Sequence, residues 1–415
     1  MAGLLLGQTL ARLLIASAVF AGGLNLAHAI PAVTPQTSLS ETSVAKTVTA
    51  AKRKPVKKAA KKTAKRKTQS LVIVSKPPND APDFDFHARI EEAQALAEKQ
   101  PTLPGDMTFD ARGNLTRFVW TLVVGQKTGP LTVLRMDEKG FNDAGFNITW
   151  AVDNFINTRF TITRPEGYIV FAQRRPVRSA SKPGTYEMGL YTAYAPEMDT
   201  KTMRTAGMDY LKQLQRLAYN RIKDHDVRSR VSPNATVADQ IPTSMVLRLM
   251  IAEHIDPLRM RYVGIEQCIH EVLITIAANR GRAYAYAKSS AGARGISQFI
   301  EDSYHMVRDN YPGARLEPNF ERGMLDLRNA VLASVLHLDL ELTHLPQKTL
   351  KTISSSDEHL FDFLAAGYNR NPAKVAKTFH RTKSMTGGNS PAETKIYVRI
   401  QGFVGKFLKK EFDIT

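Results

Sequence analysis

Residues 288–299 read KSSAGARGISQF and form the most distinctive stretch of the chain. Two glycines, Gly292 and Gly295, alternate with alanines, and the polar residues Ser289 and Gln298 stand on either side of them. Glycine adopts backbone conformations that other residues avoid, and its missing side chain lets another molecule come close. The stretch therefore predicts a bend in the chain that presents polar side chains to a ligand.

The chain of 415 residues has room for two folded domains and a tail. At its start, Arg12 precedes the apolar run 13–20, and Ala27-His28-Ala29 has the small residues that signal peptidase requires. We interpret residues 1–29 as a secretory signal peptide, with a retained membrane anchor as the alternative. The predicted location is the periplasm or cell envelope. Cys268 is the single cysteine, so no disulfide can form within the chain, and we expect it to be a buried apolar residue.

The net charge of +18 is concentrated near the N-terminus, where residues 1–68 contain twelve basic residues and one acidic residue. The tract from Lys52 to Lys67 is rich in alanine and lysine and has no aromatic residue to stack on a base. We predict that residues 30–80 are a disordered linker. In an exported protein this tract would bind anionic wall polymers or a membrane surface, or serve only as a spacer, and we expect no nucleic-acid partner.

Residues 81–235 contain short β-rich runs separated by turn residues, and a helical pattern over 208–224. We predict a small α+β accessory domain whose role the sequence does not indicate. From residue 236 to the end the pattern is mainly helical. Apolar segments over 246–257, 325–342, 359–369 and 393–412 predict helices, with the long 325–342 helix amphipathic and Pro257 stopping the first of them.

Four separated blocks over roughly 242–410 resemble the soluble-lytic-transglycosylase (SLT) domain. The 288–299 stretch is similar to the family's S-x-x-GA-x-G-x-x-Q signature, and Asp326-Leu-Arg-Asn329 is similar to its D-x-x-N block. Residues 366–372 (AGYNRNP) resemble the A-Y-N-A-G-P motif, with Asn371 in place of the family's glycine. Residues 393–398 (ETKIYV) match E-T-x-x-Y-V. The resemblance implies a lysozyme-like domain over 236–415.

The family's catalytic glutamate stands nine residues before the first serine of this signature, and that position is Arg280 here. Residues 251–257 (IAEHIDP) resemble the family's acid-bearing helix, so we align Glu253 with the catalytic acid and infer an insertion of about 27 residues after Pro257. Glu253 follows Met250 and Leu249 on an apolar helix, so we expect its carboxyl to face the core near the negative end of that helix. Burial and the helix end both raise the pKa of a carboxyl, as a general acid requires.

Glu271 is the alternative acid, on a helical stripe over 263–278, and loss of activity is the third possibility. We expect residues 272–287 to form two short strands around a turn, because apolar and polar residues alternate there. This β insertion would follow the acid-bearing helix.

The resemblance implies a lytic transglycosylase that cleaves the β-1,4 bond between N-acetylmuramic acid and N-acetylglucosamine in peptidoglycan glycan strands. One glutamate would protonate the glycosidic oxygen and then accept the proton of the C6 hydroxyl, forming a 1,6-anhydro product without metal or cofactor. Ser289, Gln298 and Tyr368 would bind substrate or orient the acid. Asn369 belongs to the same substrate-binding set, although its position in the motif favours a role in holding the turn.

Two further functions stay open at this point. A hydrolytic muramidase on the same fold would need a second acid, and Asp256 and Glu271 are the nearby residues of that type. A non-catalytic wall-binding or scaffold protein would use the accessory domain and basic tail instead. The predicted fold class is α+β: a mainly helical lysozyme-like domain with a small β insertion, preceded by the accessory domain and a disordered basic tail.

Overall fold

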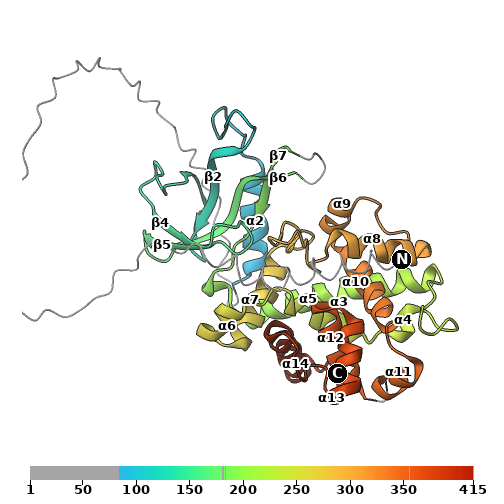
Figure 1. Ribbon diagram of the computed structural model, residues 1–415. Coiled ribbons are helices and arrows are strands. Elements are labelled where there is room, and N and C mark those ends of the chain that lie inside the picture. The colour runs from blue at the N-terminus through green and yellow to red at the C-terminus, as the bar shows by residue number, and fades with distance from the viewer. Residues whose placement is uncertain (1–83, 180–181, 183, 355, 415) are drawn as a thin grey trace, which may run out of the picture. The chain divides into compact units, whose positions relative to one another are not determined.

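The computed structural model describes residues 84–179, 182, 184–354 and 356–414. The predicted signal peptide and lysine tract lie outside the described residues. One helix and then seven strands come first among the described elements, and helices follow, so the chain is of mixed α and β structure, as expected (Figure 1).

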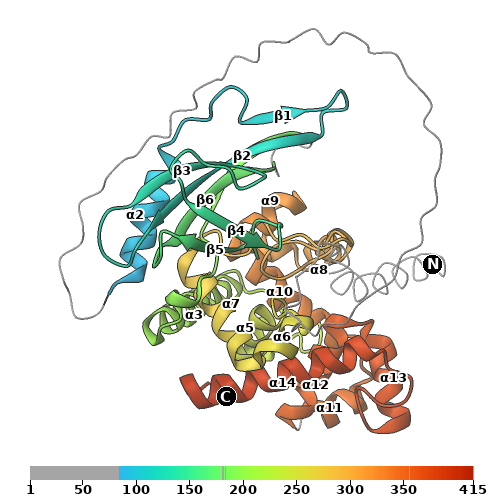
Figure 2. The same cartoon turned by 90° about the vertical axis from the view of Figure 1, so that its left-hand side faces the viewer.

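The first part of the fold is a curved antiparallel sheet with helix α2 (Phe86–Glu98) on one face (Figure 2). Along the sheet the strand order is β1-β2-β6-β7, and β3 also pairs with β2. A separate hairpin consists of β4 and β5. The strand bounds are β1 Met107–Phe109, β2 Leu115–Gly125, β3 Thr132–Asp137, β4 Asn147–Ala151, β5 Arg159–Arg164, β6 Ile169–Arg178 and β7 Tyr186–Tyr191.

The second half of strand β2, from Trp120 to Gly125, is buried on both faces, which its sequence explains. Trp120, Leu122 and Val124 point to one side and pack with the aromatic residues of the β4–β5 hairpin. Val123 points to the other side and packs with Ile90 of α2. Because side chains alternate along a strand, a continuous apolar run supplies two cores at once.

The second part of the fold is helical. Helix α3 crosses α7 so closely at Gly207 that a Cβ there would lie 2.0 Å from the Leu273 carbonyl oxygen, and α3 also packs on α10. The helix bounds are α3 Lys201–Asp224, α4 Val237–Gln240, α5 Thr243–Ala252, α6 Pro257–Val263, α7 Ile265–Ala278, α8 Glu301–Asn310, α9 Phe320–Leu325, α10 Leu327–Leu342, α11 Gln347–Ser354, α12 Asp357–Asn369, α13 Pro372–Thr382 and α14 Ala392–Phe412, with short 3-10 turns at Pro196–Met198 and Pro312–Ala314.

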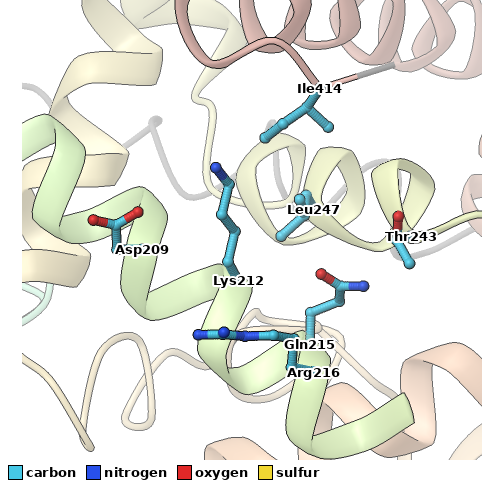
Figure 3. Close-up of a pocket in the computed structure, with 7 residues that line it drawn as sticks. All are labelled: Asp209, Lys212, Gln215, Arg216, Thr243, Leu247 and Ile414. Carbon is cyan, nitrogen blue, oxygen red and sulfur yellow. The ribbon is translucent and has the colours of Figure 1, made fainter.

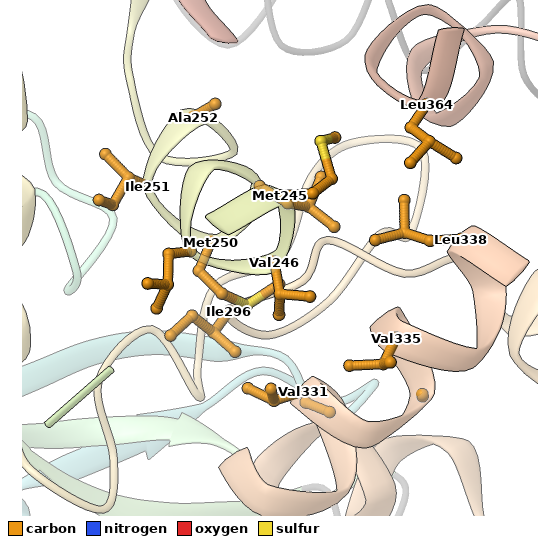
Figure 4. Close-up of a cluster of buried hydrophobic side chains, with 14 of the residues drawn as sticks. Met245, Val246, Met250, Ile251, Ala252, Ile296, Val331, Val335, Leu338 and Leu364 are labelled. Carbon is orange, nitrogen blue, oxygen red and sulfur yellow. The ribbon is translucent and has the colours of Figure 1, made fainter. Parts of the chain in front are cut away.

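Helix α10 is buried around nearly its whole circumference, so the prediction that it is amphipathic was wrong. Val331, Val335 and Leu338 face α5, where Met245, Val246 and Met250 meet them (Figure 4). Other helices pack on the remaining sides of α10, namely α3, α8 and α12. A helix that is covered on all sides has no solvent-facing stripe. Polar residues therefore do not recur in its sequence at the helical spacing.

The prediction of a β insertion over 272–287 was also wrong. Residues 272–278 are the last two turns of α7, and residues 279–286 form turns with no strand among them. Ile274 and Ala277 pack under the sheet while Leu273 and Ile276 pack among the helices. The helical stripe expected over 263–278 is helix α7 (Ile265–Ala278). Because the last two turns of this helix are apolar on both sides, residues 272–278 also resembled a buried strand.

Helix α7 also connects the sheet to the helices through a buried polar contact. The Asn279 side-chain oxygen accepts a hydrogen bond from the Thr192 amide at 2.7 Å, and its Nδ2 donates to the Thr192 carbonyl at 2.9 Å. Gln94 of α2 donates to the Ala278 carbonyl at 2.9 Å. The end of β7 is therefore held directly against the end of α7. The predicted domain boundary near residue 235 stays a prediction, although α3, which precedes it, packs with helices that follow it.

Candidate active site

Glu253 lies at the C-terminal end of α5, where its amide still donates to the Leu249 carbonyl at 3.1 Å. The preceding turn is anchored in the core, because Met250 and Ile251 are buried. The Glu253 side chain itself is half-buried. The apolar run therefore positions the carboxyl where the core meets solvent, rather than wholly inside the core.

Tyr397 and Gln401 of α14 hold the Glu253 carboxyl. The Tyr397 hydroxyl donates a hydrogen bond to Glu253 Oε1, and Gln401 Nε2 donates to the Tyr397 hydroxyl at 3.0 Å. Residues four apart face the same side of a helix, so one face of α14 supplies both links. Burial, with the neighbouring Glu253 carboxyl as the next cause, raises the pKa of Tyr397 well above its ordinary value, so it acts as a donor.

Burial raises the pKa of Glu253 to about 7, and the Tyr397 hydrogen bond opposes that rise. The carboxyl is therefore present in both protonation states near neutral pH. A group with such a pKa can both donate and accept a proton at that pH, which is the property a general acid–base residue needs.

The residue after Glu253 connects the acid's helix to the 288–299 loop. His254 Nε2 lies 2.9 Å from the Ile296 carbonyl oxygen, and its ring stacks on Tyr284 with centroids 3.6 Å apart. Burial lowers the pKa of His254 to about 3, so it is neutral and serves as a fixed hydrogen-bond partner.

The same loop is joined to the block at 366–372. Tyr368 donates its hydroxyl to the Ser297 carbonyl at 2.6 Å. Ser297 in turn donates to the Ala330 carbonyl of α10 at 3.1 Å, one residue past the Asp326–Asn329 block. Position 295 requires glycine, because its φ is +72° and a Cβ there would lie 2.8 Å from the Met324 carbonyl oxygen.

Asn369 contributes to the framework of this site. Its side-chain oxygen accepts a hydrogen bond from Thr394 Oγ1 at 2.9 Å, which joins the 366–372 block to the block at 393–398. Tyr397 belongs to that last block and contacts Glu253. All four blocks that the sequence singled out are thus linked, directly or through an adjoining residue, in the neighbourhood of Glu253.

Ser289 and Gln298 make local contacts within their own loop. Ser289 Oγ accepts from the Ala293 amide at 3.0 Å, which closes a turn. Gln298 has a positive φ of +47°, and its Nε2 donates to the Gly295 carbonyl at 2.8 Å. Both side chains are half-buried, and their predicted contact with substrate stays a prediction.

Glu271, the alternative acid, is buried in an ion cluster. Arg259 Nε donates to its Oε2 at 2.7 Å and Arg259 Nη2 to its Oε1, while Arg159 Nη2 from β5 donates to Oε2 at 2.6 Å. Two guanidinium groups therefore engage both oxygens, and Glu271 joins the β4–β5 hairpin to α7. This geometry favours Glu253 over Glu271 as the acid.

Sequence reasoning did not assign Tyr397, Gln401 or Arg159 a role. A signal for Tyr397 was present, because it lies in the E-T-x-x-Y-V block, and Gln401 follows it one helical turn later. Arg159 is separated from Glu271 by 112 positions, and no local pattern indicates that pair.

Within the described ranges, no group of three or more His, Cys, Asp or Glu side chains is placed to hold a metal ion. Nor is any helix in that part of the chain long and apolar enough to cross a membrane. Comparison of the chain with protein-family models, curated proteins and solved structures found no match.

Proposed function

We propose that the chain is a peptidoglycan lytic transglycosylase with a lysozyme-like helical domain, and that Glu253 is its acid. The observation that carries the proposal is the environment of Glu253: a half-buried carboxyl with a pKa of about 7, held by Tyr397. The contacts that bring the other three blocks into the same neighbourhood support the resemblance on which the proposal rests.

In the proposed reaction, protonated Glu253 gives its proton to the glycosidic oxygen as the bond from C1 of N-acetylmuramic acid to that oxygen breaks. The carboxylate then takes the proton of the C6 hydroxyl, and O6 bonds to C1. Glu253 is returned to its starting state, and no water is consumed. The pKa near 7 suits both halves of this cycle, because the proton must leave and return at the same pH.

The hydrolytic alternative would use a second carboxylate to activate water. Of the two residues available to it, Glu271 is bound by two arginines. Asp256 caps α6 by accepting from the Leu258 amide at 2.8 Å. Both therefore have structural partners, which favours a reaction in which the substrate's own hydroxyl is the nucleophile.

The test is digestion of purified peptidoglycan by the full chain, with mass spectrometry of the released fragments. An anhydro end is lighter than a hydrolysed end by one water, so the product mass separates the two reactions. Glu253→Gln should abolish release of anhydro fragments, with a loss of about 10²–10⁴-fold or more, because one residue performs both transfers.

A matched control is Glu266→Gln, which removes an exposed carboxylate from α7 and should leave product release unchanged. Circular dichroism should show the same helix content in both variants. If a folded Glu253→Gln still released anhydro fragments, Glu253 would not be the acid. Absence of product from the wild type would favour the scaffold function.

A further inference from the structure

A pocket of about 570 Å³ lies between α3, α5 and the end of α14. Leu247 and Gln215 are buried at its base, while Asp209 and Thr243 stand exposed at its rim. Figure 3 shows Lys212 extending toward Ile414 on the opposite wall. Leu247 stands six positions before Glu253, about 9 Å along the helix, so the pocket is distinct from the proposed active site.

Gln215 is the first sign that this pocket takes a ligand. Its side chain is only 7% exposed. Figure 3 shows its amide turned into the space between Leu247 and Thr243, and no hydrogen-bond partner stands beside it within the described part of the chain. The amide is open to the pocket and forms no hydrogen bond within the described chain, so a ligand group that both accepts and donates a hydrogen bond can pair with it.

The second sign is positive charge without a counter-ion. Lys212 and Arg216 line the pocket one helical turn apart on α3, and neither has a carboxylate within ion-pair distance among the described residues. Lys212 Nζ instead lies over the Phe412 ring, 5.9 Å from its centroid. Two cations at one pocket, neither of them in an ion pair among the described residues, favour a bound anion, and the planar guanidinium suits a carboxylate in particular.

The remaining lining residues restrict the chemical class of the ligand further. Leu247 and Ile414 offer apolar surface beside the amide and the cations. Asp209 at the rim brings the formal charge of the lining to +1, which disfavours a multiply charged anion such as phosphate. A ligand with one carboxylate, a peptide group and a small apolar side chain satisfies all three kinds of group.

We propose that this pocket binds the free C-terminus of a peptide. The terminal carboxylate pairs with Lys212 and Arg216, the last peptide group bonds to the Gln215 amide, and the terminal side chain rests on Leu247 and Ile414. The proposal does not depend on catalysis by Glu253.

The experiment is isothermal titration calorimetry of the full chain with N-acetyl-alanyl-alanine, its C-terminal amide and inorganic phosphate. The free acid should bind, and the amide should bind roughly tenfold more weakly or worse, because it loses a charge-assisted contact. Phosphate at equal concentration and ionic strength should not displace the acid. Equal binding of acid and amide, displacement by phosphate, or no binding of the acid would each overturn the proposal.

Variants locate the site and keep the test independent of folding. Lys212→Met and Arg216→Met should each weaken binding about tenfold. Gln215→Leu should do the same while leaving the fold intact, because the amide forms no hydrogen bond within the described chain and the leucine is of similar size. Lys201→Met, an exposed lysine at the start of the same helix, is the matched control and should bind as wild type. Unchanged binding in all three pocket variants would refute this location.

Glu253→Gln should bind the peptide as the wild type does. A protein that binds peptide but releases no glycan fragments would therefore retain this inference while the proposed function failed.

Discussion

Replacing Glu253 by glutamine should make the protein more stable at alkaline pH, and the size of the gain follows from the burial of its carboxyl. The ordinary pKa of 4.5 is raised to about 7 in the folded chain. Between these values the folded state binds more protons than the unfolded state, so this group makes stability fall as pH rises. The loss is complete above the folded pKa.

The magnitude follows from about 1.4 kcal/mol for each unit of pKa difference. The wild type should lose under about 1 kcal/mol at pH 5 and about 3 kcal/mol at pH 8 relative to a chain whose group at this position does not ionise. Glutamine is close to isosteric, and its side-chain oxygen can still accept from Tyr397. The variant should therefore match the wild type at pH 4 to 5 and exceed its unfolding free energy increasingly toward pH 8.

Urea unfolding of both proteins, followed by the circular dichroism of the helices at several pH values, measures this difference. The exposed Glu266→Gln is again the control, and its difference from wild type should not change with pH. A gap between Glu253→Gln and wild type that stays constant from pH 5 to 8 would refute the argument, because it would place the Glu253 carboxyl in a water-like environment.

Tyr397→Phe removes the hydrogen bond that lowers the pKa of the proposed acid, so the alkaline limit of peptidoglycan cleavage should move to higher pH. An unchanged pH–rate profile would show that Tyr397 does not influence the pKa of the acid. Arg259→Met leaves Glu271 buried with one arginine and should cost about 3 kcal/mol in urea unfolding, and the double change with Glu271→Met should recover part of it. Gly367→Ala puts a Cβ 2.6 Å from a buried carboxylate oxygen and should lower the melting temperature, whereas Gly402→Ala meets nothing within 4 Å and should raise it slightly.

Much of the secondary structure followed from the sequence. One of the short β-rich runs is strand β2, and the apolar segment before Pro257 is helix α5, which ends at Ala252, before the proline acts; Pro257 instead begins α6. These patterns are local: alternation, turn residues and proline act over a few positions. The position of Glu253 at the end of an apolar helix was predictable for the same reason.

The tertiary structure determined the contacts between distant segments, which local sequence patterns do not indicate. Helix α7 lies between the sheet and the other helices, and because both sides of its last two turns are buried, residues 272–278 fitted a strand as well as a helix. The pairing of Glu253 with Tyr397 spans 144 positions, and that of Arg159 with Glu271 spans 112. Glu253 is half-buried and Glu271 is bound by two arginines because of chain segments that meet only after folding. The sequence alone determined that two glutamates lie near the family-like blocks, and only packing and charge in the folded chain distinguished the two.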